Sequence, residues 1–336
     1  MDLPVYHGLI DIWDEKQAVL GESVKSGAKF KLGADLAFDT GRRESDLAEF
    51  CLLSERAATD PAFFDGDARD QEEFVLAGDL LKFRSRISTK IAENNTVWVQ
   101  LNRHSDRRKA VVVFHHWNAE KRSKQVASFL VSQGITVAEI AMPYHFERSR
   151  RGASHADYML SPNLGLTIQS MRQAVFDGLD LVRWLSLQGY KEISVLGMSL
   201  GSWVAGLVSA HEETVSKAAL FLAGGSLADM VWSGRATRHI RSSLDPCIAL
   251  DELRQAWLPL DLCNGASRLA RPGLKIQMIL AERDRVVLPE ISDRLVEGLR
   301  AAGVSLEVHA LNCGHYSFAL PPYALRAGLH LRRFLK

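Results

Sequence analysis

Short apolar runs alternate with longer amphipathic stretches from about residue 110 to the end of the chain. Apolar runs rich in β-branched residues are typical of strands buried on both faces, and the stretches between them have helical periodicity. The predicted strands cover residues 110–114, 135–141, 193–196, 217–223, 274–281 and 305–311. The predicted helices cover residues 120–133, 166–188, 202–211, 289–302 and 323–334. This alternation predicts an α/β fold with a mostly parallel central sheet flanked by helices.

The chain before residue 110 has a different pattern. Residues 74–87 and 97–102 are predicted to be strands on either side of a turn at 93–95, which gives an antiparallel entry to the sheet. Residues 1–72 contain helix-like pieces, such as 44–57, and no motif that carries chemistry. We expect an N-terminal extension over residues 1–72 that packs on a main domain over residues 73–336.

Composition argues against a nucleic-acid-binding protein, a membrane protein and a disulfide-rich protein. The 336 residues are 47% hydrophobic and 24% charged, with a formal net charge of +1, so no global charge favours nucleic acid or a membrane surface. No apolar stretch approaches the ~18–20 residues of a membrane span, and the N-terminus lacks the pattern of a secretory signal. Four scattered cysteines fit reduced thiols better than disulfides or a zinc site, which predicts a cytoplasmic protein. Oligomeric state does not follow from these features.

The candidate chemistry begins with the pentapeptide Gly197-Met198-Ser199-Leu200-Gly201, which lies between a predicted strand and a predicted helix. A serine hydroxyl becomes a useful nucleophile on a tight turn beside a base and backbone donors, and a G-x-S-x-G turn supplies that setting. The alternative is an ordinary turn flanked by glycines. The order of strand, turn and helix favours Ser199 as a catalytic nucleophile.

A nucleophilic serine also needs a histidine that takes its proton and an acid that orients the histidine. His315 follows the last predicted strand in the turn Cys313-Gly314-His315, whereas His309 lies inside that strand and is expected to pack or to face solvent. Asp284 follows the preceding strand and is favoured over Glu282 because it lies deeper in the loop. Asp229 is a third candidate acid.

Together these motifs resemble the α/β-hydrolase superfamily, over roughly residues 75–336, and within it the esterases and dienelactone-hydrolase-like members. The resemblance implies an eight-strand type of sheet, the chain order serine, acid, histidine, and a triad of Ser199, Asp284 and His315. It also implies an insertion over residues 225–272 that forms a cap above the substrate pocket.

In the same superfamily two backbone N–H groups stabilise the oxyanion, one of them from the residue after the nucleophile, here Leu200. The second donor is expected from the loop His115-His116-Trp117-Asn118. Many members have His-Gly at this point, so His116 departs from the pattern. Either Trp117 or His116 is the donor, and Trp117 is favoured.

Several further side chains are predicted to shape the substrate site. His116, Tyr144, His145 and Trp232 are candidate substrate-binding residues, although a structural role at the rim is an alternative for Tyr144 and His145. In the predicted cap the candidate apolar lining residues are Trp232, Trp257, Leu258 and Leu260. Arg235, Arg238 and Arg241 fall at helical spacing, which indicates a solvated face or, alternatively, contacts to an anionic substrate group.

The sequence therefore predicts a serine hydrolase that acts on a carboxylic ester or related small-molecule acyl compound. No cofactor and no metal are expected, because adjacent histidines on an extended backbone point to opposite faces and no matching carboxylate cluster is visible. An acyltransferase with the same triad and a non-catalytic binding protein of the same fold are the alternatives.

Overall fold

The computed structural model describes residues 4–23, 25, 27–38, 46–65 and 73–336 of the chain. Within this part, nine strands form one sheet in the order β1-β2-β3-β5-β4-β6-β7-β8-β9. The strands are β1 (Val75–Ala77), β2 (Leu80–Arg84), β3 (Thr96–Asn102), β4 (Lys109–Phe114), β5 (Ile135–Ile140), β6 (Glu192–Met198), β7 (Val215–Phe221), β8 (Lys275–Ala281) and β9 (Leu306–Leu311). Strands β4 to β9 pair in parallel, and β1, β2 and β3 pair antiparallel with their neighbours. The α/β fold and its antiparallel entry are confirmed.

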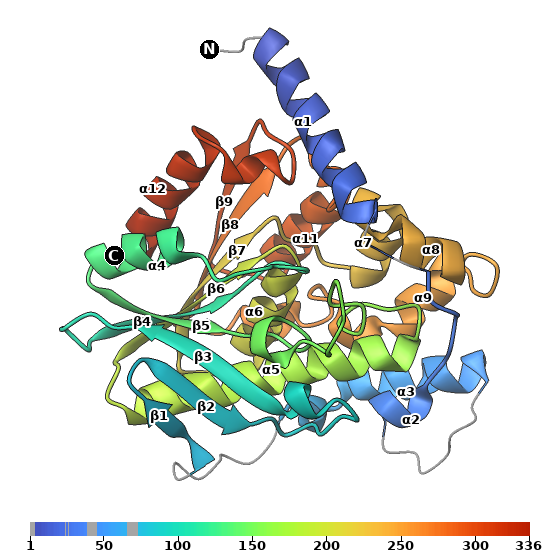
Figure 1. Ribbon diagram of the computed structural model, residues 1–336, viewed down its shortest axis with the longest axis horizontal. Coiled ribbons are helices and arrows are strands. Elements are labelled where there is room, and N and C mark those ends of the chain that lie inside the picture. Colours follow the sequence, from blue (N-terminus) through green and yellow to red (C-terminus); the bar gives the residue numbers. More distant parts are fainter. Residues whose placement is uncertain (1–3, 24, 26, 39–45, 66–72) are drawn as a thin grey trace.

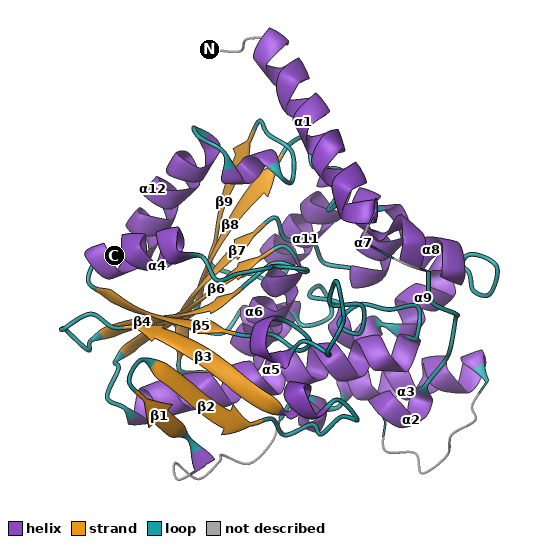
Figure 2. Ribbon diagram, viewed as in Figure 1, coloured by secondary structure: helices purple, strands orange, loops and turns teal. Residues whose placement is uncertain are grey.

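Helices cover both faces of the sheet (Figures 1 and 2). The helices are α1 (Pro4–Ser23), α2 (Ala34–Ala37), α3 (Leu47–Thr59), α4 (Lys124–Ser132), α5 (Leu164–Leu187), α6 (Leu200–His211), α7 (Leu227–Ser233), α8 (Arg238–Leu244), α9 (Leu250–Ala256), α10 (Ala266–Leu269), α11 (Pro289–Ala301) and α12 (Tyr323–Leu335). Because successive side chains of a strand point to opposite faces, β4 buries Val112 and Phe114 in one apolar cluster and Val111 in another. Helices α5 and α6 contribute to the first cluster, and α4 and α12 contribute to the second.

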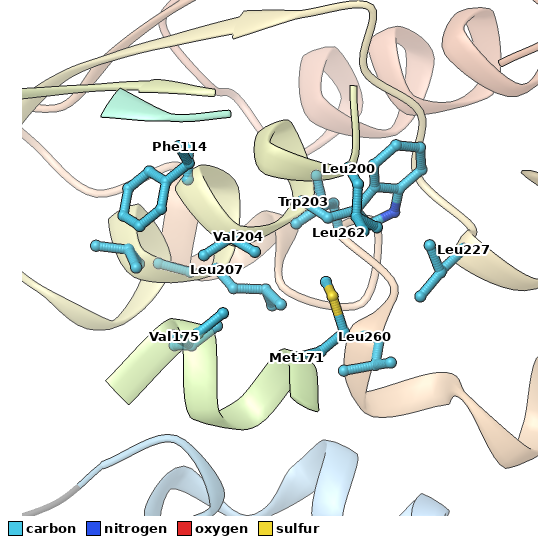
Figure 3. Close-up of a cluster of buried hydrophobic side chains, with 14 of the residues drawn as sticks. Phe114, Met171, Val175, Leu200, Trp203, Val204, Leu207, Leu227, Leu260 and Leu262 are labelled. Atoms are coloured by element: carbon cyan, nitrogen blue, oxygen red, sulfur yellow. The ribbon is translucent and has the colours of Figure 1, made fainter. Parts of the chain in front are cut away.

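The larger cluster holds the helix that follows Ser199 in place. Figure 3 shows side chains of α5 and α6 meeting in its centre, with Met171 and Val175 on α5 and Val204 and Leu207 on α6. The indole of Trp203 is fully buried there and donates a hydrogen bond of 2.9 Å to the carbonyl of Gly225. This packing fixes α6 against the sheet.

Residues 225–272, the predicted cap, form α7 to α10 with short turns between them. Two of the side chains predicted to line an apolar pocket are core residues instead: Trp257 is 1% exposed and Leu260 is 0% exposed. The Trp257 indole donates to the carbonyl of Leu164 at the start of α5. The prediction was wrong for these two residues, because apolar composition alone does not distinguish a pocket wall from a packed interior.

Element boundaries differ from the predicted ones where turn residues intervene. The predicted strand at 74–87 is a hairpin of β1 and β2, since Gly78 adopts a φ of +62° between them. The helix predicted from residue 120 begins at Lys124, because the Ser123 side chain caps it by accepting from the N–H of Val126.

The N-terminal residues pack at two places on the main domain. Helix α3 lies against α9, where the Ser54 hydroxyl donates to the carbonyl of Ala256 over 2.7 Å. Helix α1 approaches α7 at its C-terminal end and reaches past the sheet at its N-terminal end (Figure 1). Residues 1–3, 24, 26, 39–45 and 66–72 of the predicted extension lie outside the described residues. Among the described helices, none combines the length and the apolar character needed to cross a membrane.

Candidate active site

Ser199 occupies a strained turn between β6 and α6. Its φ of 52° and ψ of −123° are unusual for a residue with a side chain. Such a conformation costs on the order of 1–3 kcal/mol and persists only when the surroundings enforce it. Here the N–H of Ser199 donates to the carbonyl of Phe221 on β7 over 2.9 Å, and the Ser202 hydroxyl donates to the Ser199 carbonyl over 2.6 Å. The sheet and the helix thus hold the serine in this turn.

The two glycines of the pentapeptide are required by close backbone packing. A Cβ on Gly197 would lie 2.3 Å from the carbonyl oxygen of Gly201. A Cβ on Gly201 would lie 2.3 Å from the carbonyl oxygen of Phe114 and 2.5 Å from that of His115. The turn at Ser199 therefore rests directly against the loop that follows β4, the loop predicted to complete the oxyanion hole.

Asp284 and His315 meet at the carboxyl ends of β8 and β9. The Nδ1 of His315 lies 2.7 Å from Oδ2 of Asp284. The other carboxylate oxygen, Oδ1, accepts from the N–H groups of Val286 and Val287 over 2.7 and 2.9 Å. A carboxylate held in this way fixes an imidazole with Nδ1 protonated and leaves Nε2 free to accept a proton. Among the described residues, the His315 ring makes no hydrogen bond to the hydroxyl of Ser199.

The other candidate acids and the other histidine are engaged elsewhere or exposed. Asp229 pairs with Arg254, whose guanidinium lies 2.6 Å from its carboxylate. Glu282 is exposed on the loop before Asp284. His309 lies on β9 and contacts Glu307 rather than the turn at Ser199.

The loop after β4 is held by two imidazoles, of which His145 is buried and His115 is half-buried. His145 accepts from the N–H of Asn118 at Nε2 over 2.9 Å, so its Nδ1 is the protonated nitrogen and donates to the carbonyl of Pro143. His115 accepts from the N–H of Met142 at Nε2 and donates from Nδ1 to the carbonyl of His116. Desolvation lowers the pKa of His145 to about 3 and the pKa of His115 well below its usual value. Both rings are therefore neutral parts of the loop.

These contacts correct two predicted substrate-binding residues. His145 is 2% exposed and both of its ring nitrogens are bound to backbone, so no ring nitrogen is left for a substrate. Tyr144 is also buried, and its hydroxyl interacts with Thr89 and Ser170. Both residues support the loops around the site because tertiary contacts turn their polar atoms inward.

The remaining predicted site residues have different surroundings. Desolvation lowers the pKa of the His116 ring, and the proximity of His315 lowers it further. The Trp117 indole donates to the carbonyl of Ala156 over 2.9 Å and stacks on His239. Trp232 is half-buried, with the guanidinium of Arg241 5.2 Å from its ring. The N–H of Leu200, at the first position of α6, has no carbonyl of its own helix to bind, as an oxyanion donor requires.

Helix α1 contributes a carboxylate beside the histidine, which the sequence did not reveal. Oδ1 of Asp14 accepts from the N–H groups of Tyr316 and Ser317 over 2.7 and 3.0 Å, and Oδ2 accepts from the Ser317 hydroxyl. A Cβ on Gly314 would lie 2.6 Å from Oδ2 of Asp14, so the glycine makes room for the carboxylate. Asp14 thereby fixes the turn that follows His315.

Ion pairs attach the rest of α1 to the same loops. Asp11 pairs with Arg283, and Glu15 and Glu22 pair with Arg235, which is 8% exposed. Arg235 is therefore buried under α1, whereas Arg238 and Arg241 form the solvated face that their spacing predicted. The cavity that α1 encloses beside His315 and Tyr316 has a volume of about 10 Å³.

The chain matches no protein-family model and no curated protein. Among solved structures it is similar to an acetyl xylan esterase from Paenibacillus sp. R4, with a TM-score of 0.56, 12% identity and coverage of 89% of this chain and 97% of that one. It is also similar to the acylaminoacyl peptidase of Pyrococcus horikoshii, with a TM-score of 0.59, 11% identity and coverage of 79% and 41%.

A puromycin-hydrolyzing peptidase of Mycobacterium tuberculosis gives a TM-score of 0.55 at 14% identity, with coverage of 71% of this chain and 36% of that one. The chain thus spans less than half the length of both peptidases and nearly all of the esterase. Similarity at this level of identity establishes the architecture, and the chain has the α/β-hydrolase fold.

Proposed function

We propose that this chain is a serine hydrolase that cleaves a carboxylic ester or a related acyl compound through an acyl-enzyme. The observation that carries the proposal is the 2.7 Å hydrogen bond between His315 and Asp284 at the sheet edge where β6 presents Ser199. The similar structures are an esterase and two peptidases, whose activities agree with acyl chemistry of this kind.

In the proposed reaction the Ser199 oxygen attacks the substrate carbonyl carbon as His315 Nε2 takes the hydroxyl proton. The imidazolium then gives that proton to the leaving alcohol oxygen as the carbonyl–oxygen bond breaks. A water molecule, deprotonated by the same nitrogen, then attacks the carbonyl carbon of the acyl-serine. The bond between that carbon and the Ser199 oxygen breaks, the imidazolium returns its proton to the Ser199 oxygen, and the carboxylic acid is released. The negative charge of Asp284 stabilises the imidazolium in both halves and keeps the ring in the required tautomer.

The oxyanion is proposed to lie between the N–H of Leu200 and an N–H of the loop after β4, with Trp117 as its donor. The contact of Gly201 with the carbonyl oxygens of Phe114 and His115 supports this assignment, because it brings the two segments together. Loss of one such donor raises the barrier by about 3–4 kcal/mol.

The space beside His315 is small. The cavity that His315 and Tyr316 line together with residues of α1 has a volume of about 10 Å³, which holds roughly one water molecule, and Ser199 is 8% exposed. Movement of α1 and of the loops that its carboxylates bind is proposed to widen this space for a substrate.

A fluorophosphonate probe tests the nucleophile. We expect the wild-type protein to be labelled and Ser199→Ala to remain unlabelled. Ser209→Ala is the matched control, because Ser209 is a fully buried serine of the same helix whose hydroxyl donates only to the carbonyl of Ala205. This control should be labelled like the wild type.

Absence of labelling in folded wild-type protein would count against the proposal, as would equal labelling of Ser199→Ala. A panel of p-nitrophenyl esters with increasing acyl length, run with the same variants, then reports the acyl preference. Product analysis with added alcohols or amines separates hydrolysis from transfer to another acceptor.

A further inference from the structure

A second group of chemically active side chains lies on the edge strand β9 and the last helix, away from Ser199. Glu307 and His309 are two residues apart on β9 and therefore face the same side of the sheet. His330 comes from α12, and its ring centroid lies 3.6 Å from that of His309. Oε1 of Glu307 lies 2.5 Å from Nε2 of His309. The strand and the helix thus bring three potential ligands to one point.

The donor set suits a transition metal. One ligand atom from each of Glu307, His309 and His330 lies within 4.8 Å of the other two. In the part of the chain that the structure describes, no other group of three histidine, cysteine or acidic residues meets this criterion. Two imidazole nitrogens and one carboxylate oxygen are ligands that Zn²⁺ accepts at about 2.0–2.2 Å, with a fourth position left for water.

The geometry is close to what a bound ion requires. Ligands at about 2.0–2.2 Å from a tetrahedral Zn²⁺ lie roughly 3.3–3.6 Å from one another. Oε1 of Glu307 and Nε2 of His309 must therefore move apart by about 1 Å, while the His330 nitrogen already lies within 4.8 Å of both ligands. Both histidines are half-buried and Glu307 is exposed, which leaves their side chains room to rotate and leaves the site open to solvent. The stacked imidazole rings must separate slightly so that both nitrogens face the ion.

The buried side-chain amide of Gln277 makes hydrogen bonds to two members of the cluster. Gln277 on β8 is 0% exposed, and its Nε2 lies 3.2 Å from Oε1 of Glu307 and 3.3 Å from the carbonyl oxygen of His330. It therefore touches both elements of the cluster and orients the carboxylate, as outer hydrogen bonds do at metal sites. Its Oε1 is buried without a partner among the described residues, and a metal-bound water is a donor that would satisfy it.

We propose that Glu307, His309 and His330 bind one Zn²⁺ ion that ties α12 to the edge strand β9. The site is structural: it joins the last helix to the strand that precedes the turn at His315. The inference does not depend on the proposed hydrolase function, because none of its ligands takes part in that chemistry.

Isothermal titration of tag-free, metal-free protein with Zn²⁺ tests the site. We expect one saturable equivalent for the wild type and a loss of affinity of at least about tenfold for His309→Gln and His330→Gln. His104→Gln is the matched control for the histidines, and Glu297→Gln, on the exposed face of α11, is the control for Glu307→Gln. Both controls should bind like the wild type, and Glu307→Gln should bind more weakly.

Two further measurements keep the test decisive. Zn²⁺ should raise the unfolding temperature of the wild type and of the two controls but not that of His330→Gln. The unfolding temperature of His330→Gln without metal shows whether this variant folds. Co²⁺ should give the intense visible absorption of a low-coordinate site in the wild type and in the two controls, but not in His309→Gln or His330→Gln. The proposal is overturned if the wild type binds no saturable equivalent of Zn²⁺, or if His309→Gln and His330→Gln retain its affinity.

Discussion

Ser199, Asp284 and His315 depend on their neighbours in different ways. The serine is held by backbone hydrogen bonds and by glycines that allow close packing, so its position follows from the turn itself. The histidine depends on one carboxylate oxygen, because Oδ1 of Asp284 is already bound by two backbone N–H groups. The tautomer of His315 is thus the most sensitive feature of the proposed site.

We expect Asp284→Asn to reduce the rate of fluorophosphonate labelling and of ester hydrolysis by on the order of 10⁴, because an amide no longer holds Nδ1 protonated and Nε2 free. The measurement is kcat/KM for a p-nitrophenyl ester together with the labelling rate. Glu282→Gln, two residues earlier on the same loop and exposed, is the matched control and should leave both rates unchanged. Equal losses in the two variants would point to the loop rather than to the tautomer.

Helix α1 is attached mainly by charged and polar contacts. Among its described side chains, Ile10 and Ala18 are buried, whereas Leu9, Ile12 and Val19 are more than half exposed. Its acidic side chains bind Arg235, Arg283 and the backbone around His315. An element held in this way contributes little apolar burial but fixes the loops that it touches.

Asp14→Ala should disturb the site without disrupting the fold. The variant leaves the N–H groups of Tyr316 and Ser317 without their acceptor, at a cost of about 1–3 kcal/mol if water does not replace it. We expect a lower free energy of unfolding and a lower kcat, measured by urea unfolding and ester hydrolysis. Lys16→Ala, an exposed residue of the same helix, is the control. Unchanged kcat in Asp14→Ala would show that the turn at His315 is ordered without α1.

At the scale of the whole molecule, three desolvated histidines, the buried His145 and the half-buried His211 and His239, link stability to pH. Desolvation lowers the pKa of His145 to about 3, and it lowers the pKa of His211 and of His239 to about 4. In the unfolded chain a histidine titrates near 6.5. Between these values the unfolded state binds protons that the folded state does not, so stability is full above about pH 6.5 and falls as the solution becomes more acidic.

Urea unfolding between pH 7 and pH 4.5 should therefore show a free energy of unfolding that falls as pH falls, by up to about 1.4 kcal/mol per pH unit for each such histidine. His145→Gln should reduce that slope by close to one proton, in addition to any loss of stability at pH 7. A slope that is the same in wild type and His145→Gln would contradict the neutral, backbone-bound state of this ring.

Patterns of residues adjacent in sequence predicted much of the fold. Runs of β-branched residues predicted the strands of the parallel sheet, and the glycines around Ser199 predicted the turn between β6 and α6, because both depend on residues adjacent in sequence. The order of the strands also implied that Asp284 and His315 follow neighbouring strands, and the hydrogen bond between them agrees. Their catalytic role stays a prediction.

Other features depended on which surfaces meet in three dimensions. Polar atoms of Tyr144 and His145 turn inward because they make hydrogen bonds or other polar contacts with groups distant in sequence. Trp257 is part of the core because its indole binds the carbonyl of Leu164 at the start of α5.

Long-range pairs also depend on the tertiary structure. Asp14 lies some three hundred residues from the turn that it binds, and the proposed metal ligands Glu307 and His330 come from separate elements. The helices, the strands and the turn at Ser199 follow from residues close together along the chain, since local sterics and hydrophobic period set them. Which side chains are buried and which partners they find depends on the packed molecule, because burial and long-range pairing arise only when distant segments meet.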